Sequence, residues 1–162
     1  MRRPDPARGP TEGTVVALAG NPNVGKTTLF NSLTGMRQHT GNWPGKTVGL
    51  AQGQCRCRDV TLVDLPGTYS LLSHSPEEQV ARSFLCRGLA QQVLVVCDGS
   101  TLARNLVLVL QILEITPHVT VCVNLLGEAR RRGFSLDLEL LSQRLGIPVY
   151  AVEARSRNSA QA

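Results

Sequence analysis

An early segment of the chain combines glycine, lysine and threonine at a spacing that binds phosphate. It reads Gly20-Asn-Pro-Asn-Val-Gly25-Lys26-Thr27, between a β-branched apolar run and helix-like sequence. Glycines let the backbone curl until its N–H groups point at phosphate oxygens, and the following helix adds its positive end. Lys26 would reach the β and γ phosphates, and Thr27 offers a hydroxyl to Mg²⁺. We therefore predict nucleotide contacts from Gly20, Asn21, Pro22, Asn23, Val24, Gly25, Lys26, Thr27 and Thr28.

Two further positions suit a magnesium ion and a terminal phosphate. Asp64-Leu-Pro-Gly67 follows an apolar run, so Asp64 can hold Mg²⁺, commonly through water, and the Gly67 amide can reach the γ-phosphate. This pattern alone is a common turn, and the phosphate loop gives it weight. Thr47 could complete the Mg²⁺ shell when a γ-phosphate is present, although Thr40 competes for that role and a β-branched residue opening a strand is the simpler alternative. The predicted metal ligands are Thr27, Thr47 and Asp64.

An alternation of apolar strands and amphipathic helices must position these residues. With 162 residues, 42% hydrophobic and 4% aromatic, the chain can form one domain with an aliphatic core. The alternation predicts an α/β fold with a mostly parallel sheet, whose loops meet at the carboxyl ends of the strands. Six strands are expected, at 14–19, 47–58, 60–63, 93–97, 119–123 and 148–152, with helices at 26–33, 76–88, 103–115 and 136–145.

Composition along the chain sets the expected domain boundaries. Residues 1–13 are rich in proline, glycine and arginine, and we expect a disordered lead-in there; residues 14–157 form the domain, and residues 158–162 form a polar tail. Residues 36–46 contain two glycines and a proline, so we expect no regular structure there and an exposed Trp43. Ser75 followed by proline and two acids is expected to begin a helix.

Charge, cysteines and hydropathy exclude several classes of protein. The net charge of +5 is carried by scattered arginines without aromatic neighbours, which argues against nucleic acid as a partner. Five cysteines, two of them in apolar runs, indicate reduced core thiols, and Cys55 and Cys57 lack the second pair that a structural zinc site needs. The chain has no apolar signal region, and its apolar runs are too short to span a bilayer, so we expect this polypeptide to be soluble.

Four runs of residues together resemble one known family. They are Gly20–Asn31 (GNPNVGKTTLFN), Thr40–Val48 (TGNWPGKTV), Asp64–Leu71 (DLPGTYSL) and Arg104–Leu106 before a leucine-rich helix. In this combination they resemble the N-terminal G domain of the bacterial ferrous-iron transporter B family, FeoB. The resemblance covers roughly residues 14–157 and implies a Ras-like P-loop GTPase domain, a three-layer α/β/α structure with a six-stranded, mostly parallel sheet.

The resemblance also implies a setting and a set of roles. The family's G domain is the cytoplasmic part of an inner-membrane protein that takes up Fe²⁺, and a helical regulatory domain and a membrane domain follow it. It binds GTP and GDP with Mg²⁺ and hydrolyses GTP slowly, with K⁺ stimulation in some members. Asn23 is implied as a contact for the cation or the transition state, with a simple turn former as the alternative. The implied catalytic residues are Asn23, Lys26, Thr47 and Gly67.

The sequence departs from the family pattern where the base should be read. The family has Asn-x-x-Asp after the fifth strand, whereas this chain reads Asn124-Leu-Leu-Gly127, and the neighbouring Glu128 is one residue out of register. Losing the aspartate removes two charge-assisted hydrogen bonds to guanine. The final base-contacting loop is Glu153-Ala154 in place of Ser-Ala, and Glu153 could replace the lost carboxylate. We predict base contacts from Asn124, Glu153 and Ala154, and weakened guanine recognition.

Three functions remain open at this point. The first is a slow GTPase domain that regulates or energises Fe²⁺ uptake, slow because Thr68 replaces the glutamine that orients water in Ras-type enzymes. The second is a soluble GTPase associated with ribosomes or tRNA, and the third is a degenerate module that binds nucleotide without hydrolysing it. Partners expected for the first are the helical and membrane domains of a full-length transporter, with a homo-oligomer left open.

Overall fold

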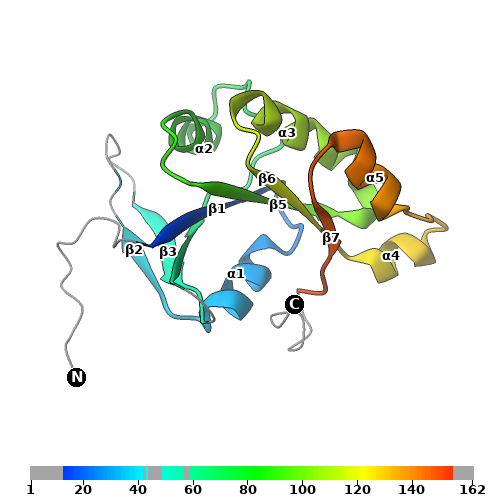
Figure 1. Ribbon diagram of the computed structural model, residues 1–162, viewed down its shortest axis with the longest axis horizontal. Helices are drawn as coiled ribbons and strands as arrows, with labels where there is room; N and C mark the ends of the chain where they lie inside the picture. The colour runs from blue at the N-terminus through cyan, green and yellow to red at the C-terminus, as the bar shows by residue number, and fades with distance from the viewer. Residues whose placement is uncertain (1–12, 42, 44–48, 57–58, 155–162) are drawn as a thin grey trace.

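The computed structural model describes residues 13–41, 43, 49–56 and 59–154. Their elements form three layers, in which one sheet separates two sets of helices (Figure 1). The sheet has seven strands in the order β2-β3-β4-β1-β5-β6-β7. Five of them run parallel, and β2 and β3 are antiparallel to their neighbours at one edge. The strands are β1 (Thr14–Gly20), β2 (Gln38–Gly41), β3 (Leu50–Gln54), β4 (Val60–Asp64), β5 (Gln92–Asp98), β6 (Val119–Asn124) and β7 (Val149–Ala151).

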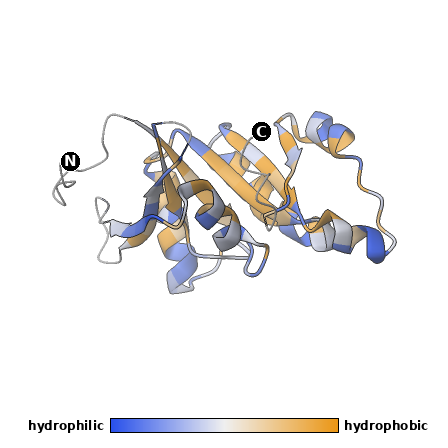
Figure 2. Cartoon of the chain, turned by 90° about the horizontal axis from the view of Figure 1, so that it is seen from below, coloured by the Kyte–Doolittle hydropathy of each residue, from blue (hydrophilic) through white to orange (hydrophobic). Residues whose placement is uncertain are grey.

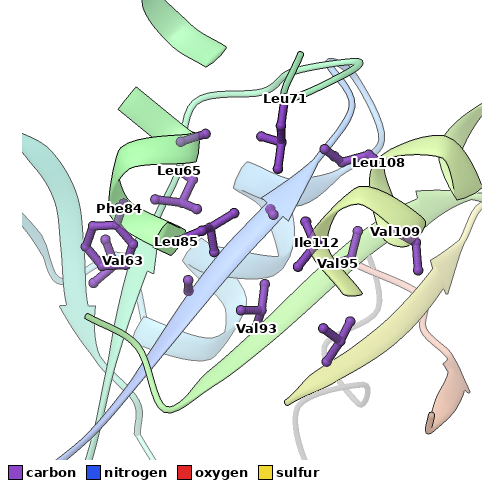
Figure 3. Close-up of a cluster of buried hydrophobic side chains, with 14 of the residues drawn as sticks. Val63, Leu65, Leu71, Phe84, Leu85, Val93, Val95, Leu108, Val109 and Ile112 are labelled. Carbon is purple, nitrogen blue, oxygen red and sulfur yellow. The ribbon is translucent and has the colours of Figure 1, made fainter. Parts of the chain in front are cut away.

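Helices cover both faces of the sheet and bury two aliphatic clusters. The helices are α1 (Lys26–Thr34), α2 (Pro76–Cys86), α3 (Leu102–Ile115), α4 (Leu126–Arg131) and α5 (Leu138–Leu145), with a 3₁₀ turn, η1 (Gly99–Thr101), before α3. Helices α2 and α3 pack on one face over alternate residues of β1, β4 and β5 (Figure 3). Helix α1 packs on the other face against Val16, Leu18 and Leu62. The central strands are therefore apolar on both sides, as Figure 2 shows by colour.

The caps of the helices match their sequence signals. Ser75 caps α2, and its hydroxyl accepts a hydrogen bond of 3.2 Å from the Glu78 amide. Gly146 ends α5 in the left-handed conformation, with φ at 69°. Helix α5 begins at Leu138, two residues later than expected, because the Asp137 carboxylate accepts the Leu140 amide at 2.9 Å and thereby fixes the first turn. No helix in the described ranges is both long and apolar enough to cross a membrane.

The sheet has one strand more than the six expected. Residues 38–41 were expected to be irregular, but they pair with β3 in antiparallel register, from Gln38 opposite Gly53 to Gly41 opposite Leu50. Three of the four residues in β2 are exposed, so the strand has no alternating apolar pattern to reveal it. Residues 38–41 form a strand because they pair with β3, and not because of their own sequence pattern. The short helix α4 was also missed, because six residues give too little periodicity to detect.

The expectation that Trp43 is exposed is wrong. Its side chain is 5% exposed and belongs to the cluster beneath α2. The indole meets the ring of Phe84 edge to face, with centroids 5.1 Å apart and an interplanar angle of 78°. Local glycine and proline content indicated an exposed loop, but the area of an indole favours burial wherever a pocket lies within reach. Trp43 is thereby anchored to α2.

Candidate functional site

The loop between β1 and α1 has the tight curl that its glycines predict. Asn23 and Gly25 both have positive φ, at 64° and 92°. A β-carbon on Gly20 would lie 2.7 Å from the Val96 carbonyl oxygen, and one on Gly25 would lie 2.2 Å from the Asn124 amide nitrogen. Both positions therefore require glycine. The loop passes into α1 at Lys26 with its amides at the positive end of the helix.

Lys26 is buried inside this loop and has one counter-ion. The residue is 8% exposed, and its ammonium forms an ion pair with the Asp64 carboxylate at the end of β4. The two residues are 38 positions apart in sequence, and the fold brings them together as expected for a phosphate site. Thr27 and Thr28 follow on the exposed side of α1, where their hydroxyls are open to a ligand.

The loop after β4 lies directly against the phosphate loop. The Leu65 amide donates to the Leu18 carbonyl at 3.0 Å, and the Thr68 amide donates to the Gly20 carbonyl at 3.1 Å. A β-carbon on Gly67 would approach Pro22 Cα to 3.3 Å. The structure therefore brings Asp64 and Gly67 to the loop as predicted. Thr68 is 4% exposed, and its amide is already used.

Asn124 links three loops at the other end of the site. Its side-chain amide donates to the Val24 carbonyl at 3.0 Å, and its oxygen accepts the Ala154 amide at 3.3 Å. Asn124 is 4% exposed, and Ala154 and Val24 belong to the cluster beneath α1. The site residues predicted on separate strands are thus joined by one side chain. Sequence reasoning assigned Asn124 to the base and missed this structural role.

The first turn of α4 carries no carboxylate directed at the site. Gly127 is exposed, and a β-carbon there would have no atom within 4 Å. Glu128 pairs with Arg131 at 2.6 Å and with Arg132 at 3.6 Å on its own helix. The hydrogen bond and charge of Arg131, helped by Arg132, lower the pKa of Glu128. This carboxylate is therefore ionised and held along α4.

Other predicted and unpredicted groups surround these loops. Thr47 lies outside the described residues. Thr40, its competitor, lies in β2 opposite Ala51, which in turn lies opposite Asp64. Two strand spacings of about 5 Å each therefore separate Thr40 from Asp64.

Asn21 is a buried residue that sequence reasoning treated only as a loop member. Its Oδ1 has no hydrogen-bond partner among the described residues. The described residues contain no group of three or more potential metal-binding side chains.

The curled glycine loop, its buried lysine and the adjoining aspartate, set at the carboxyl ends of parallel strands, define a P-loop domain of the Ras-like GTPase class. The comparisons with known proteins place it further. The family model for ferrous iron transport protein B matches residues 14–162, and the chain belongs to this family, FeoB.

Relatives and solved structures agree with that assignment. The chain is 49% identical over 140 residues to the Fe(2+) transporter FeoB of Salmonella typhimurium (strain LT2), covering 83% of this chain and 18% of that protein. The G domain of the T. maritima FeoB iron transporter is 41% identical, with a TM-score of 0.79 and coverage of 88% of this chain and 89% of that one. The cytosolic domain of the same transporter in a GDP form gives a TM-score of 0.82 at 41% identity, over 94% of this chain and 61% of that one. The resemblance inferred from the motifs and the predicted Ras-like α/β fold are thus confirmed.

The chain spans about a fifth of the length of the curated relatives it matches. The similarity therefore concerns their G domain.

Proposed function

We propose that this chain binds guanine nucleotide, as GTP or GDP with Mg²⁺, and hydrolyses GTP slowly as the G domain of a ferrous-iron transport protein. The observation that carries the proposal is the curled loop from Gly20 to Thr27 with Lys26 buried beside Asp64. Solved relatives support it, since the T. maritima cytosolic domain is described in a GDP form and a mutant of S. thermophilus NFeoB is described as bound to GDP.

The residues of the loop fit a polyphosphate. Close approach of the backbone requires glycine at positions 20 and 25, and such a backbone presents consecutive amides to anionic oxygens. Lys26 supplies one buried positive charge, which is paired with the Asp64 carboxylate. We assign the loop amides and Lys26 to the β and γ phosphates and the Gly67 amide to the γ-phosphate.

The donors near Lys26 also fit Mg²⁺. The exposed Thr27 hydroxyl and the Asp64 carboxylate are hard oxygen ligands, and the carboxylate already meets one cation, the Lys26 ammonium. When bound, Mg²⁺ would neutralise charge on the β and γ phosphates. Lys26 must leave Asp64 to reach a phosphate, so the carboxylate needs a replacement cation at that moment. We also propose Thr47 as a third ligand of Mg²⁺. Asn23 is an exposed residue of the loop, and we propose that K⁺ binds near it.

Hydrolysis is proposed to be slow because threonine, and not the glutamine that orients water in Ras-type enzymes, follows Gly67. Thr68 occupies the position after Gly67, but it is 4% exposed and its amide is bonded to Gly20. A threonine is also shorter than a glutamine and has no carboxamide. Stabilisation of the transition state then falls to Lys26, the Gly67 amide, Asn23 and the bound cations.

Guanine recognition is proposed to be weaker than in relatives with aspartate at position 127. Gly127 offers no acceptor, and Glu128 is paired with arginines on its own helix. Glu153 and Ala154 close the base end of the site, and Ala154 is held by Asn124. Losing two charge-assisted hydrogen bonds corresponds to about a hundredfold in affinity.

In the cell, we propose that the nucleotide state of this domain regulates or energises Fe²⁺ uptake. Its partners would be the helical and membrane domains of a full-length transporter, which place it on the cytoplasmic side of the inner membrane. A homo-oligomer remains compatible with this role.

A turnover assay tests the proposed activity. Phosphate release from GTP, measured with and without K⁺, should be slow, dependent on Mg²⁺ and abolished by Lys26→Ala. Nucleotide binding without any Lys26-dependent phosphate release would instead identify a non-hydrolysing module.

A further inference from the structure

The base end of the site differs from its phosphate end in how its polar groups are used. A site that selects guanine needs acceptors for the N1–H and the 2-amino group and a donor for O6. Four positions could supply them: Gly127, Asn124, Glu153 and the Ala154 amide. Gly127 has no side chain to offer, Asn124 and the Ala154 amide are bonded to each other, and Glu153 is an exposed residue.

The acceptor is missing at Gly127. Its backbone lies in the first turn of α4, and the space where a side chain would begin is open, with no atom within 4 Å. The adjacent Glu128 carboxylate pairs with Arg131 and Arg132 on its own helix.

The donors are engaged in holding the loops together. The Asn124 amide group donates to the Val24 carbonyl at 3.0 Å, and the Ala154 amide donates to the Asn124 oxygen at 3.3 Å. Both bonds are buried. The second N–H of the Asn124 carboxamide could still donate to N7 of a purine, but guanine and adenine both have this acceptor, so the contact would not select guanine.

The missing carboxylate at position 127 is also the group that would reject adenine. Adenine has a lone pair at N1 where guanine has a proton, so a carboxylate facing that edge repels adenine as well as attracting guanine. With glycine at position 127, no side chain from this position faces the N1 edge of either guanine or adenine. The polyphosphate contacts, by contrast, are independent of the base.

We propose that this site selects its ligand by the triphosphate and not by the base, so that ATP is bound and hydrolysed alongside GTP, with Gly127 as the specificity-determining position. This inference rests on the proposed nucleotide site and names its substrate class as purine nucleoside triphosphates.

Calorimetric titration of the chain with GTP and with ATP, both with Mg²⁺, tests the inference. We expect the two dissociation constants to agree within about tenfold. Gly127→Asp should tighten GTP by about a hundredfold without tightening ATP, because it restores two charge-assisted hydrogen bonds. Gly127→Asn is the matched control: it adds nearly the same volume without the charge, and we expect less than about a tenfold change in the GTP to ATP ratio.

Glu128→Gln separates this account from the alternative that Glu128 turns toward the base. We expect the GTP to ATP ratio to stay unchanged in this variant, and a fall in that ratio would overturn the inference. A wild-type preference for GTP of more than about tenfold, or equal tightening of both nucleotides by Gly127→Asp, would also overturn it.

The Lys26→Ala variant keeps the two proposals distinguishable. If GTP alone binds and Lys26→Ala abolishes its binding, only the inference on base selection fails. If neither nucleotide binds, or if Lys26→Ala leaves both affinities unchanged, the proposed nucleotide site itself fails.

Discussion

The two ends of the candidate site are built in different ways. At the phosphate end, the backbone conformation of the loop after β1 shapes the site, and Lys26 and Asp64 add side-chain charge. At the base end, we propose that selection depends on single side chains, and Gly127 has none to offer. A backbone-built subsite needs glycines that any substitution would disrupt. A side-chain subsite can lose its specificity by one substitution and leave the fold intact.

The largest expected effect breaks the backbone-built end. Gly25→Ala would place a β-carbon 2.2 Å from the Asn124 amide nitrogen at a φ of 92°. The left-handed conformation costs about 1–2 kcal/mol and an unpaired Asn124 amide about 1–3 kcal/mol, so GTP affinity should fall roughly a thousandfold. Calorimetric titration of the variant with GTP measures this loss of affinity.

Gly133→Ala is the matched control for that variant. Gly133 has a φ of 82°, but a β-carbon added there would have no atom within 4 Å, so this variant carries the conformational cost without the overlap. Stability should fall by about 1–2 kcal/mol, with GTP affinity unchanged. Equal losses of affinity in both variants would show that the contact with Asn124 is unimportant.

The second effect tests whether Trp43 is anchored in the core beneath α2. Trp43→Ala removes a side chain that is 5% exposed and packs on Phe84, and we expect unfolding free energy to drop by about 3 kcal/mol. Tyr150→Ala, at a residue 61% exposed in β7, should change stability by less than about 0.5 kcal/mol. Urea denaturation compares the two, and similar small losses would mean that Trp43 is not a core residue.

The third effect concerns the pair at the centre of the phosphate end. Asp64→Asn leaves the Lys26 ammonium buried without its counter-ion, which should cost about 2 kcal/mol of stability in the absence of nucleotide. In the wild type, GTP should bind more tightly with Mg²⁺ than with a chelator present. We expect Asp64→Asn to lose that difference, and a retained Mg²⁺ dependence would place the metal elsewhere.

The fourth effect depends on pH and concerns the strands beneath both ends. Burial raises the pKa of Cys97 to about 12 and the pKa of Cys122 to about 11, both from the ordinary thiol value of 9.0. The unfolded chain therefore loses these protons at lower pH than the folded chain, so stability is intact below about pH 9 and falls as the pH rises from there toward these values. Each thiol should contribute about 1.4 kcal/mol per pH unit in that window.

Urea denaturation at about pH 8 and about pH 10, with the Cys97→Ala and Cys122→Ala double variant as control, measures this slope. The unfolding free energy of the double variant should fall less steeply with pH than that of the wild type. Equal slopes would show that neither thiol is deprotonated on unfolding in this range.

The difference between the two ends also explains what the sequence could predict. The glycine loop and Asp64-Leu-Pro-Gly67 were recognisable because each residue type is required by local geometry, and the structure brings them together as expected. The parallel strands were found from their apolar runs. Strand β2 and the burial of Trp43 were missed because both depend on partners distant in sequence, β3 for the strand and Phe84 for the indole. The linking role of Asn124 was missed for the same reason, since Val24 lies 100 positions away.

A competition experiment on the unmodified chain tests the central claim most directly. Fluorescent GTP bound in the presence of Mg²⁺ is displaced with inorganic tripolyphosphate and, separately, with guanosine. If the affinity resides in the phosphate end, tripolyphosphate should displace the probe at a concentration at least about tenfold lower than guanosine does. Displacement by guanosine at the lower concentration would contradict the account.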